Sequence, residues 1–382
     1  MAKARVEVMW EALNRAWRNG EHEELWVQFR PRGADDVFEA VEEAIGVADQ
    51  VVEDAGWGDD VHTSGGVSDS DGGPVVYLRR AGHEAGLRCW LGALAQHLES
   101  LGHAGKVTNG PKVYLPGWAG GDVDSSRHLT AFVSYRTNDL TQMGEMERRG
   151  GWHVPAPLTE KIADAGAAWG LFPGADVYLS RHLHRVRTNN PNVSRPLSNA
   201  VIRSGMAGVV YLRSEPRRLV QVSFSTQGSV FYQVRDDTVP WQDRLKQVTA
   251  AMVAFPDDTD LAFLRYNWTP TTHWMALATA KPQLPYVKER HIRYNKHLHS
   301  HYTPDAHGLQ LLTDAHLLHA NDLSDWVIKP LGGGKHLVQA KHLQPWYEYP
   351  DTDPATLAKA RADFGSMILT EQTIEDNPPP WY

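Results

Sequence analysis

The sequence predicts an α+β protein in which mixed β-sheets carry helices packed on one face. Short apolar segments rich in β-branched and aromatic residues alternate with longer segments whose apolar residues recur at helical spacing. Hydrophobic residues make up 42% of the chain and charged residues 22%, as in globular proteins with a buried core. With 382 residues, the chain is long enough for two or three such domains.

Residues 1–155 are predicted to form an N-terminal α/β domain. The Gly-, Ser- and Asp-rich residues 58–74 within it are expected to form a flexible loop or a wide hairpin tip. The elements expected around this loop, in chain order, are a helix over 4–17, a strand over 25–29 that stops at Pro31, a helix over 35–55, a strand over 74–79, a helix over 83–101, and strands over 112–115 and 129–135.

Residues 156–285 are predicted to form a second α/β domain. Its expected elements are a helix over 158–169, a strand over 176–179, an antiparallel meander over 208–213, 219–224 and 229–234, a helix over 241–254 and a strand over 261–266. The motif Val-Val-Tyr-Leu-Arg occurs at 75–79 and again at 209–213. Two diverged α/β sandwich units would produce this repeat, and so would chance, because these are common strand residues.

Residues 286–350 are predicted to form a small C-terminal β-hairpin module that is rich in histidine. Apolar segments flank Gly332-Gly333-Gly334-Lys335, which indicates a hairpin turn. A phosphate-binding P-loop is excluded there, because the spacing of the glycines is wrong and no Ser or Thr follows Lys335. Residues 351–382 are expected to form a short helix over 353–367 and an extended Pro-rich tail.

The first candidate site is the histidine cluster that starts at His297. If this segment is a strand, His297, His299 and His301 share one face, because every second residue of a strand points the same way. Asp305 or Asp314, with His307 nearby, could complete a site for a divalent metal such as zinc, iron or manganese. His316 and His319 would share a face of a helix. The alternative is a solvent-exposed polar connector.

The second candidate site is a basic segment over residues 181–187. In an extended conformation, Arg181, Arg185 and Arg187 share one face and could contact the phosphates of a nucleic acid or an acidic partner. An edge strand that is protected by charge would have the same sequence.

The third candidate site consists of aromatic residues close to prolines. The chain has 14 tryptophans. We expect Trp346, Tyr347, Trp381 and Tyr382 to be partner-docking residues, because aromatic anchors dominate binding hot spots. The alternative is that they pack the C-terminal tail onto the body of the protein.

Charge and composition narrow the function classes. The formal charge of −8 is uneven: residues 1–75 hold 17 acidic and 6 basic residues, and such an acidic region favours a basic protein partner. The lone Cys89 excludes an intrachain disulfide. No signal peptide or membrane span is recognised, so we expect a cytoplasmic protein that does not contact a membrane.

The sequence does not decide whether the protein is an enzyme. It contains none of the Gly-x-Gly-x-x-Gly, His-Glu-x-x-His and Gly-x-Ser-x-Gly motifs. We therefore expect a non-catalytic, immunity-, chaperone- or adaptor-like protein that binds a macromolecular partner, most simply another protein. The alternative is a metal-dependent hydrolase or nuclease that uses the cluster from His297 to His307 and binds nucleic acid.

Overall fold

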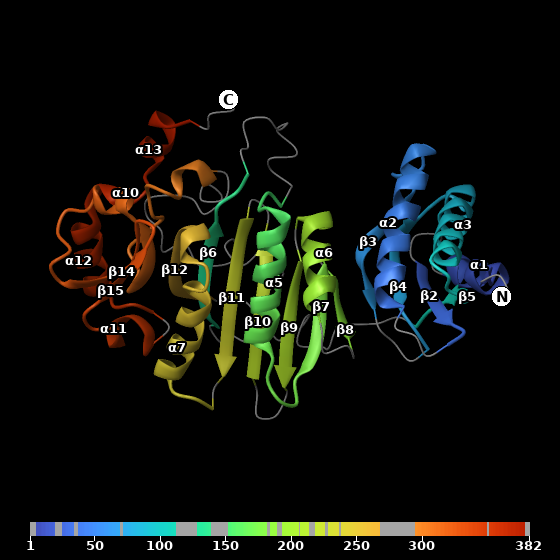
Figure 1. Ribbon diagram of the computed structural model, residues 1–382, viewed down its shortest axis with the longest axis horizontal. Helices are drawn as coiled ribbons and strands as arrows, with labels where there is room; N and C mark the ends of the chain where they lie inside the picture. Colours follow the sequence, from blue (N-terminus) through green and yellow to red (C-terminus); the bar gives the residue numbers. More distant parts are fainter. Residues whose placement is uncertain are drawn as a thin grey trace. The chain divides into compact units, whose positions relative to one another are not determined.

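The chain folds into two compact units that each combine helices with a β-sheet, which confirms the predicted α+β class (Figure 1). The first unit comprises Met1–Asp122 and Asp176–Pro191, and the second comprises Val123–Ala175 and Asn192–Tyr382. The computed structural model describes residues 5–19, 25–33, 37–68, 72–111, 128–138, 152–181, 184–188, 193–205, 207–213, 218–225, 228–236, 238–267, 295–349 and 351–378. The strand predicted over 112–115 lies outside these ranges.

The sheet of the first unit has the strand order β1-β5-β2-β4-β3. β1 and β5 are parallel, and the other neighbours are antiparallel. The strands are β1 (Val6–Val8), β2 (Leu25–Pro31), β3 (Val61–Ser68), β4 (Val75–Ala81) and β5 (Gly105–Asn109), and the helices are α1 (Trp10–Asn19), α2 (Phe38–Asp54) and α3 (Glu84–Ser100).

Two predictions for the first unit are wrong. The helix expected over 4–17 starts only at Trp10, because Val6–Val8 forms β1 beside β5. Residues 58–74, expected to be a flexible loop or a wide hairpin tip, contain β3, which is paired antiparallel with β4. The pairing of β3 with β4 shifts register between Thr63 and Val67, where the glycines lie, so an irregular strand has the composition of a loop.

The β7–β8 hairpin is grouped with the first unit. β7 (Asp176–Arg181) pairs antiparallel with β8 (His184–Thr188). The strand predicted over 176–179 is therefore present, whereas the segment predicted to be extended over 181–187 is divided between two antiparallel strands.

Eight strands of the second unit follow each other in the order β14-β15-β13-β12-β6-β11-β10-β9 and are all antiparallel. β9 (Ala207–Arg213), β10 (Arg218–Ser225) and β11 (Ser229–Asp236) form the predicted meander. The other strands are β6 (His128–Tyr135), β12 (Thr259–Asn267), β13 (Leu309–Thr313), β14 (Trp326–Gly332) and β15 (Lys335–Ala340). β14 and β15 form the predicted hairpin around the Gly-rich turn.

One face of this sheet packs against helices. Figure 1 shows α5 (Ala156–Gly170), α6 (Ser194–Ser204) and α7 (Trp241–Met252) side by side in front of the strands. Gly166 of α5 lies against Val222, and the ring of Trp169 lies 5.3 Å from that of Tyr232. Val222 and Tyr232 are paired in the sheet, so their contacts identify the helix-covered face of β10 and β11.

The opposite face of the sheet is also buried, but it is rich in polar side chains. Because residues alternate along a strand, the neighbours of Val222 and Tyr232 lie on this second face. It holds Gln221, Ser223, Gln233, Thr130 and Ser134, each at most 2% exposed. We call it the polar face below. Buried polar groups require hydrogen-bond partners, so a segment that packs on this face must supply donors and acceptors to it.

Short helices complete the second unit at its C-terminal end. They are α10 (Asp314–Leu317), α11 (Gln344–Tyr347), α12 (Pro354–Phe364) and α13 (Glu371–Asp376), with the 3₁₀ turns η4 (Lys296–Leu298) and η5 (Gly365–Met367). The helix predicted over 353–367 is thus α12 followed by η5. Within the described ranges, no helix is both long and apolar enough to span a bilayer.

The packing of α5 against the sheet predicts that Gly170→Ala is destabilising. A Cβ atom at this position would meet the ring of Tyr211, which is 1% exposed and held by a 2.8 Å hydrogen bond to the carbonyl of Ala167. We expect a loss of about 1–3 kcal/mol in the free energy of unfolding, measured by urea denaturation.

The matched control is Gly92→Ala in α3, where a new Cβ has no neighbour within 4 Å. Because alanine has a higher helix propensity than glycine, this substitution should stabilise the protein by about 1 kcal/mol. Equal effects of the two substitutions would contradict the packing described for α5.

Candidate functional site

The histidine-rich segment does not form the predicted strand. It begins with the single turn η4, and its three histidines have three different surroundings. His297 Nε2 lies 2.9 Å from the carbonyl oxygen of Asn377, and burial lowers the pKa of this ring. His301 Nδ1 lies 2.8 Å from the hydroxyl of Ser300. The ring of His299 is buried on the polar face. The three imidazoles therefore do not line one face.

The remaining residues of the proposed metal site are also engaged elsewhere. Asp305 forms a buried ion pair with Arg361, with Nε–Oδ1 and Nη2–Oδ2 distances of 2.8 and 2.7 Å. His307 stacks on Phe263 with the ring centroids 4.3 Å apart. Asp314 lies 2.6 Å from His336. In the described part of the chain, no three His, Cys, Asp or Glu side chains are placed to hold a metal ion.

His316 and His319 do not share a helix face, because α10 ends at Leu317. His316 is fully buried, and its Nδ1 accepts a hydrogen bond from the backbone N–H of Thr313 at the start of α10. Burial lowers the pKa of His316 to about 3, so this imidazole is neutral. His319 stacks on Tyr302 with the ring centroids 5.2 Å apart. These two residues thus stabilise the loop connections around α10.

A buried lysine anchors the histidine-rich segment to the polar face. Lys296 Nζ donates hydrogen bonds to the hydroxyl of Ser134, at 2.6 Å, and to the carbonyl of Tyr135. His299 Nδ1 lies 2.7 Å from the same hydroxyl. Serine, lysine and histidine are the residues of nucleophilic sites, but Ser134 is 0% exposed, so a substrate cannot reach it. We interpret this cluster as a structural anchor.

The sequence gives no local signal for the burial of Lys296. Lys296 follows the basic residues Arg290 and Arg293, and the composition of this segment alone suggests a solvent-exposed connector. Its burial becomes evident only when residue 296 is placed beside residue 134, which lies 162 positions earlier.

The arginines of the basic segment are divided between two strands. Arg181 ends β7, whereas Arg185 and Arg187 belong to β8, and the register pairs Arg181 with His184 and Arg185 with Ser180. The three arginines therefore do not lie on one extended strand, and the prediction of a single basic face over 181–187 is wrong. Their side chains lie outside the described part of the structure, so phosphate contact by these residues stays a prediction.

The aromatic docking residues fall into two groups. Trp346 and Tyr347 in α11 are 6% and 1% exposed, and the hydroxyl of Tyr347 bonds to the carbonyl of Leu264 at 3.3 Å. Tyr347 is therefore a core residue, whereas Trp346 lines a pocket. Trp381 and Tyr382 lie outside the described residues.

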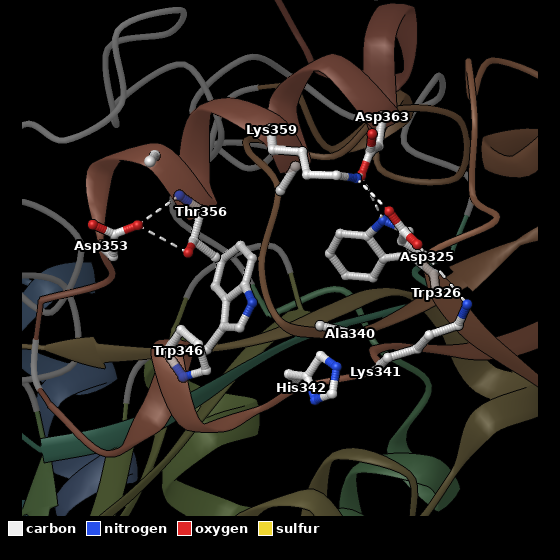
Figure 2. Close-up of a pocket in the computed structure, with 13 residues that line it drawn as sticks. Asp325, Trp326, Ala340, Lys341, His342, Trp346, Asp353, Thr356, Lys359 and Asp363 are labelled. Atoms are coloured by element: carbon white, nitrogen blue, oxygen red, sulfur yellow. Dashed lines mark hydrogen bonds and ion pairs between the residues drawn. The ribbon is translucent and has the colours of Figure 1, made fainter.

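This pocket has a volume of about 470 Å³, is open to solvent and is lined by the C-terminal elements of the second unit (Figure 2). Trp326 of β14 and Trp346 of α11 form its aromatic floor, with the ring centroids 6.1 Å apart and the planes inclined by 59°. Trp326 Nε1 donates to Asp363 of α12 at 3.2 Å. Ala340 of β15 and Ala360 of α12 add further apolar surface.

The rim of the pocket is charged. Lys359 Nζ lies 2.7 Å from Asp325 and 2.9 Å from Asp363, and Lys341 lies 3.9 Å from Asp325 (Figure 2). Asp353, at the start of α12, accepts a 2.8 Å hydrogen bond from the backbone of Thr356. The pocket is thus lined by three aspartates and two lysines, and both lysines are already close to Asp325.

An exposed strand edge adjoins the pocket. Among the described strands, β14 is the last in the sheet and pairs only with β15. It begins at Trp326 on the pocket floor and continues with Val327 and Ile328, which are 49% and 41% exposed. Lys329 and Pro330 follow, and such residues discourage uncontrolled edge pairing. The half of β14 next to the pocket therefore presents exposed apolar side chains at the edge of the sheet.

Comparison of the chain with protein-family models, with curated proteins and with solved structures gave no match.

The anchor formed by Lys296 predicts a pH dependence of stability. Burial lowers the pKa of Lys296 from its usual 10.5 to about 8, so between these values the unfolded chain binds a proton that the folded chain lacks. The free energy of unfolding should therefore rise with pH from about 8 towards 10, as chemical denaturation at several pH values can measure. Above that range, the raised pKa values of buried Tyr211 and Tyr232 act in the opposite direction.

The test compares the wild type with Lys296→Met and with Lys329→Met, which removes an exposed lysine on β14. The rise should disappear in Lys296→Met alone. A rise of the same size in all three proteins would show that Lys296 is not responsible.

Proposed function

We propose that the protein is a non-catalytic interaction protein whose C-terminal module binds an extended segment of a partner protein. The observation that carries this proposal is the pocket floored by Trp326 and Trp346 beside the exposed half of β14. A strand added to a sheet edge gains main-chain hydrogen bonds, and neighbouring pockets supply specificity for its side chains.

The pocket suits an apolar anchor side chain of the partner. Its tryptophans are 7% and 6% exposed and are held by neighbouring groups: Trp326 packs edge-on against Phe364, with the ring centroids 4.7 Å apart, and Trp346 packs against Gly308. Such a preorganised aromatic floor binds a side chain with little loss of its own conformational freedom. A volume of about 470 Å³ is sufficient for a large aromatic or aliphatic residue.

The charged residues at the rim of the pocket indicate which residues of the partner segment lie next to its apolar anchor. Three aspartates outnumber two lysines, and Lys341 and Lys359 are both within 4 Å of Asp325. A basic residue next to the anchor would therefore be attracted, most directly by Asp353 at the pocket mouth. We propose a partner segment in which an aromatic or long aliphatic residue is followed or preceded by Lys or Arg.

The metal-dependent alternative has less support. It requires the residues from His297 to His307 to meet at one point, whereas in the described structure they contact Asn377, Ser134, Ser300, Arg361 and Phe263.

The proposal predicts the sequences selected from a displayed random-peptide library. Enriched peptides should carry an apolar anchor with an adjacent basic residue, and their affinity should fall at least about tenfold with Ala355→Trp, which fills the pocket from an exposed position of α12. Fluorescence polarisation with a selected peptide measures this change.

The matched control is Ala358→Trp, because Ala358 is exposed on the same helix but does not line the pocket. This variant should bind like the wild type. Equal binding by Ala355→Trp and the wild type, or a failure of the library to enrich any peptide, would refute the proposal.

A further inference from the structure

Oε1 of Gln233 and Nε2 of His307 are buried on the polar face and have no hydrogen-bond partner among the described residues. The two residues are 0% and 8% exposed. Leaving such an atom unsatisfied is destabilising, because the atom loses its hydrogen bonds to water without a replacement. An unsatisfied buried group in a native structure therefore calls for a specific explanation.

In two other buried glutamines, both the oxygen and the nitrogen of the side-chain amide form hydrogen bonds. Gln310, on the polar face of β13, accepts from the hydroxyl of Thr303 at 2.8 Å and donates to the carbonyl of His307 at 3.3 Å. Gln28 in the first unit donates to the carbonyl of Gly73 and accepts from Arg30. Gln233, by contrast, uses only its Nε2, which donates to Thr130 at 3.3 Å.

The register of the sheet places Gln233 close to an arginine. Gln233 on β11 is paired with Thr130 on β6, which is paired in turn with Arg265 on β12. These residues form one row across three adjacent strands, and neighbouring strands lie about 5 Å apart. Gln233 and Arg265 are thus separated by two strand spacings on the same face.

His307 lies over the neighbouring row of the same face, which contains Phe263 and Phe132. Its ring stacks on Phe263, with the ring centroids 4.3 Å apart and the planes inclined by 6°. Phe263 precedes Arg265 by two residues on β12, so both are on the polar face. Both unsatisfied atoms therefore belong to side chains that lie near Arg265.

Two arginines contribute positive charge near these atoms. Arg265 is half-buried, and Arg235, two residues beyond Gln233 on the same face of β11, is 8% exposed. Burial is the main cause that lowers the pKa of His307, and the positive charges of Arg265 and Arg361 lower it further. The imidazole is thus neutral in a positive field, with one ring nitrogen able to donate.

We infer that the polar face holds a phosphate group between Arg265, His307 and Gln233. The guanidinium group of Arg265 donates to phosphate oxygens, as arginine commonly does for this anion. His307 Nε2–H donates to another oxygen. Gln233 Oε1 accepts a hydrogen bond from a P–O–H group or from a hydroxyl of a phosphorylated small molecule, which distinguishes such ligands from an unprotonated oxyanion.

The test measures thermal unfolding and calorimetric binding near neutral pH with inorganic phosphate, glycerol 3-phosphate and sulfate, each up to about 10 mM. Inorganic phosphate carries a P–O–H group and glycerol 3-phosphate carries hydroxyls, whereas sulfate has no donor at this pH. Both phosphate ligands should bind more tightly than sulfate. Tighter binding of inorganic phosphate would identify it as the ligand class, and tighter binding of glycerol 3-phosphate would indicate a phosphorylated metabolite.

Two substitutions separate the contributions. Arg265→Met should weaken the binding of both phosphate ligands at least about tenfold, because a charge-assisted contact is lost. Gln233→Leu retains the arginine and should remove the preference for phosphate over sulfate. If Arg265→Met does not fold, Gln233→Leu still tests the inference.

The control is Lys329→Met, which removes the same charge from the exposed edge strand β14. It should bind phosphate like the wild type. The inference fails if neither phosphate ligand binds, if sulfate binds equally well to the wild type, or if Lys329→Met weakens binding as much as Arg265→Met.

Discussion

The second unit depends on one constraint, which is that the polar face of its sheet is buried and must be supplied with hydrogen bonds. The helix-covered face is filled by apolar side chains such as Val222, for which packing suffices. On the other face, Ser134 and Gln310 are both 0% exposed and are reached by residues 295–307. Lys296 bonds to Ser134 and Thr303 bonds to Gln310, so this segment satisfies that half of the face.

The same constraint explains why the histidines are clustered without forming a common site. His299 shares the hydroxyl of Ser134 with Lys296, and Asp305 is neutralised by Arg361, as a buried carboxylate requires. These groups connect the segment to the sheet and to α12. His307 differs because part of its hydrogen-bonding capacity is unused, and Gln233 shares this property. The functional proposal for the polar face rests on that exception.

The sequence predicted secondary structure correctly where apolar residues followed a regular helix or strand spacing. The meander of β9, β10 and β11 and the β14–β15 hairpin were predicted from apolar runs and turn residues, and both are present. Irregular pairing concealed β3, because the glycines at its register shift have the composition of a loop. The strand predicted over residues 297–301 is wrong. The conformation of this segment is determined by contacts with Ser134 and Asn377, which are distant in the sequence and leave no local pattern.

The candidate sites were harder to predict than the fold. Trp346 was identified from its neighbouring proline, but its position beside Trp326 depends on the packing of α11 against β14. The row of polar residues was not evident, because Thr130 and Arg265 are more than 100 residues apart in the sequence. Alternating polar residues such as those around Gln233 also usually indicate a strand face that is exposed to solvent. Only the register shows that these polar side chains share one buried row.

A high-resolution crystal structure of the protein grown in phosphate would show directly whether the polar face holds this anion. We expect a tetrahedral anion within about 3 Å of Gln233 Oε1, His307 Nε2 and the guanidinium group of Arg265. Protein groups bonded to both Gln233 Oε1 and His307 Nε2, with no anion at Arg265, would contradict it.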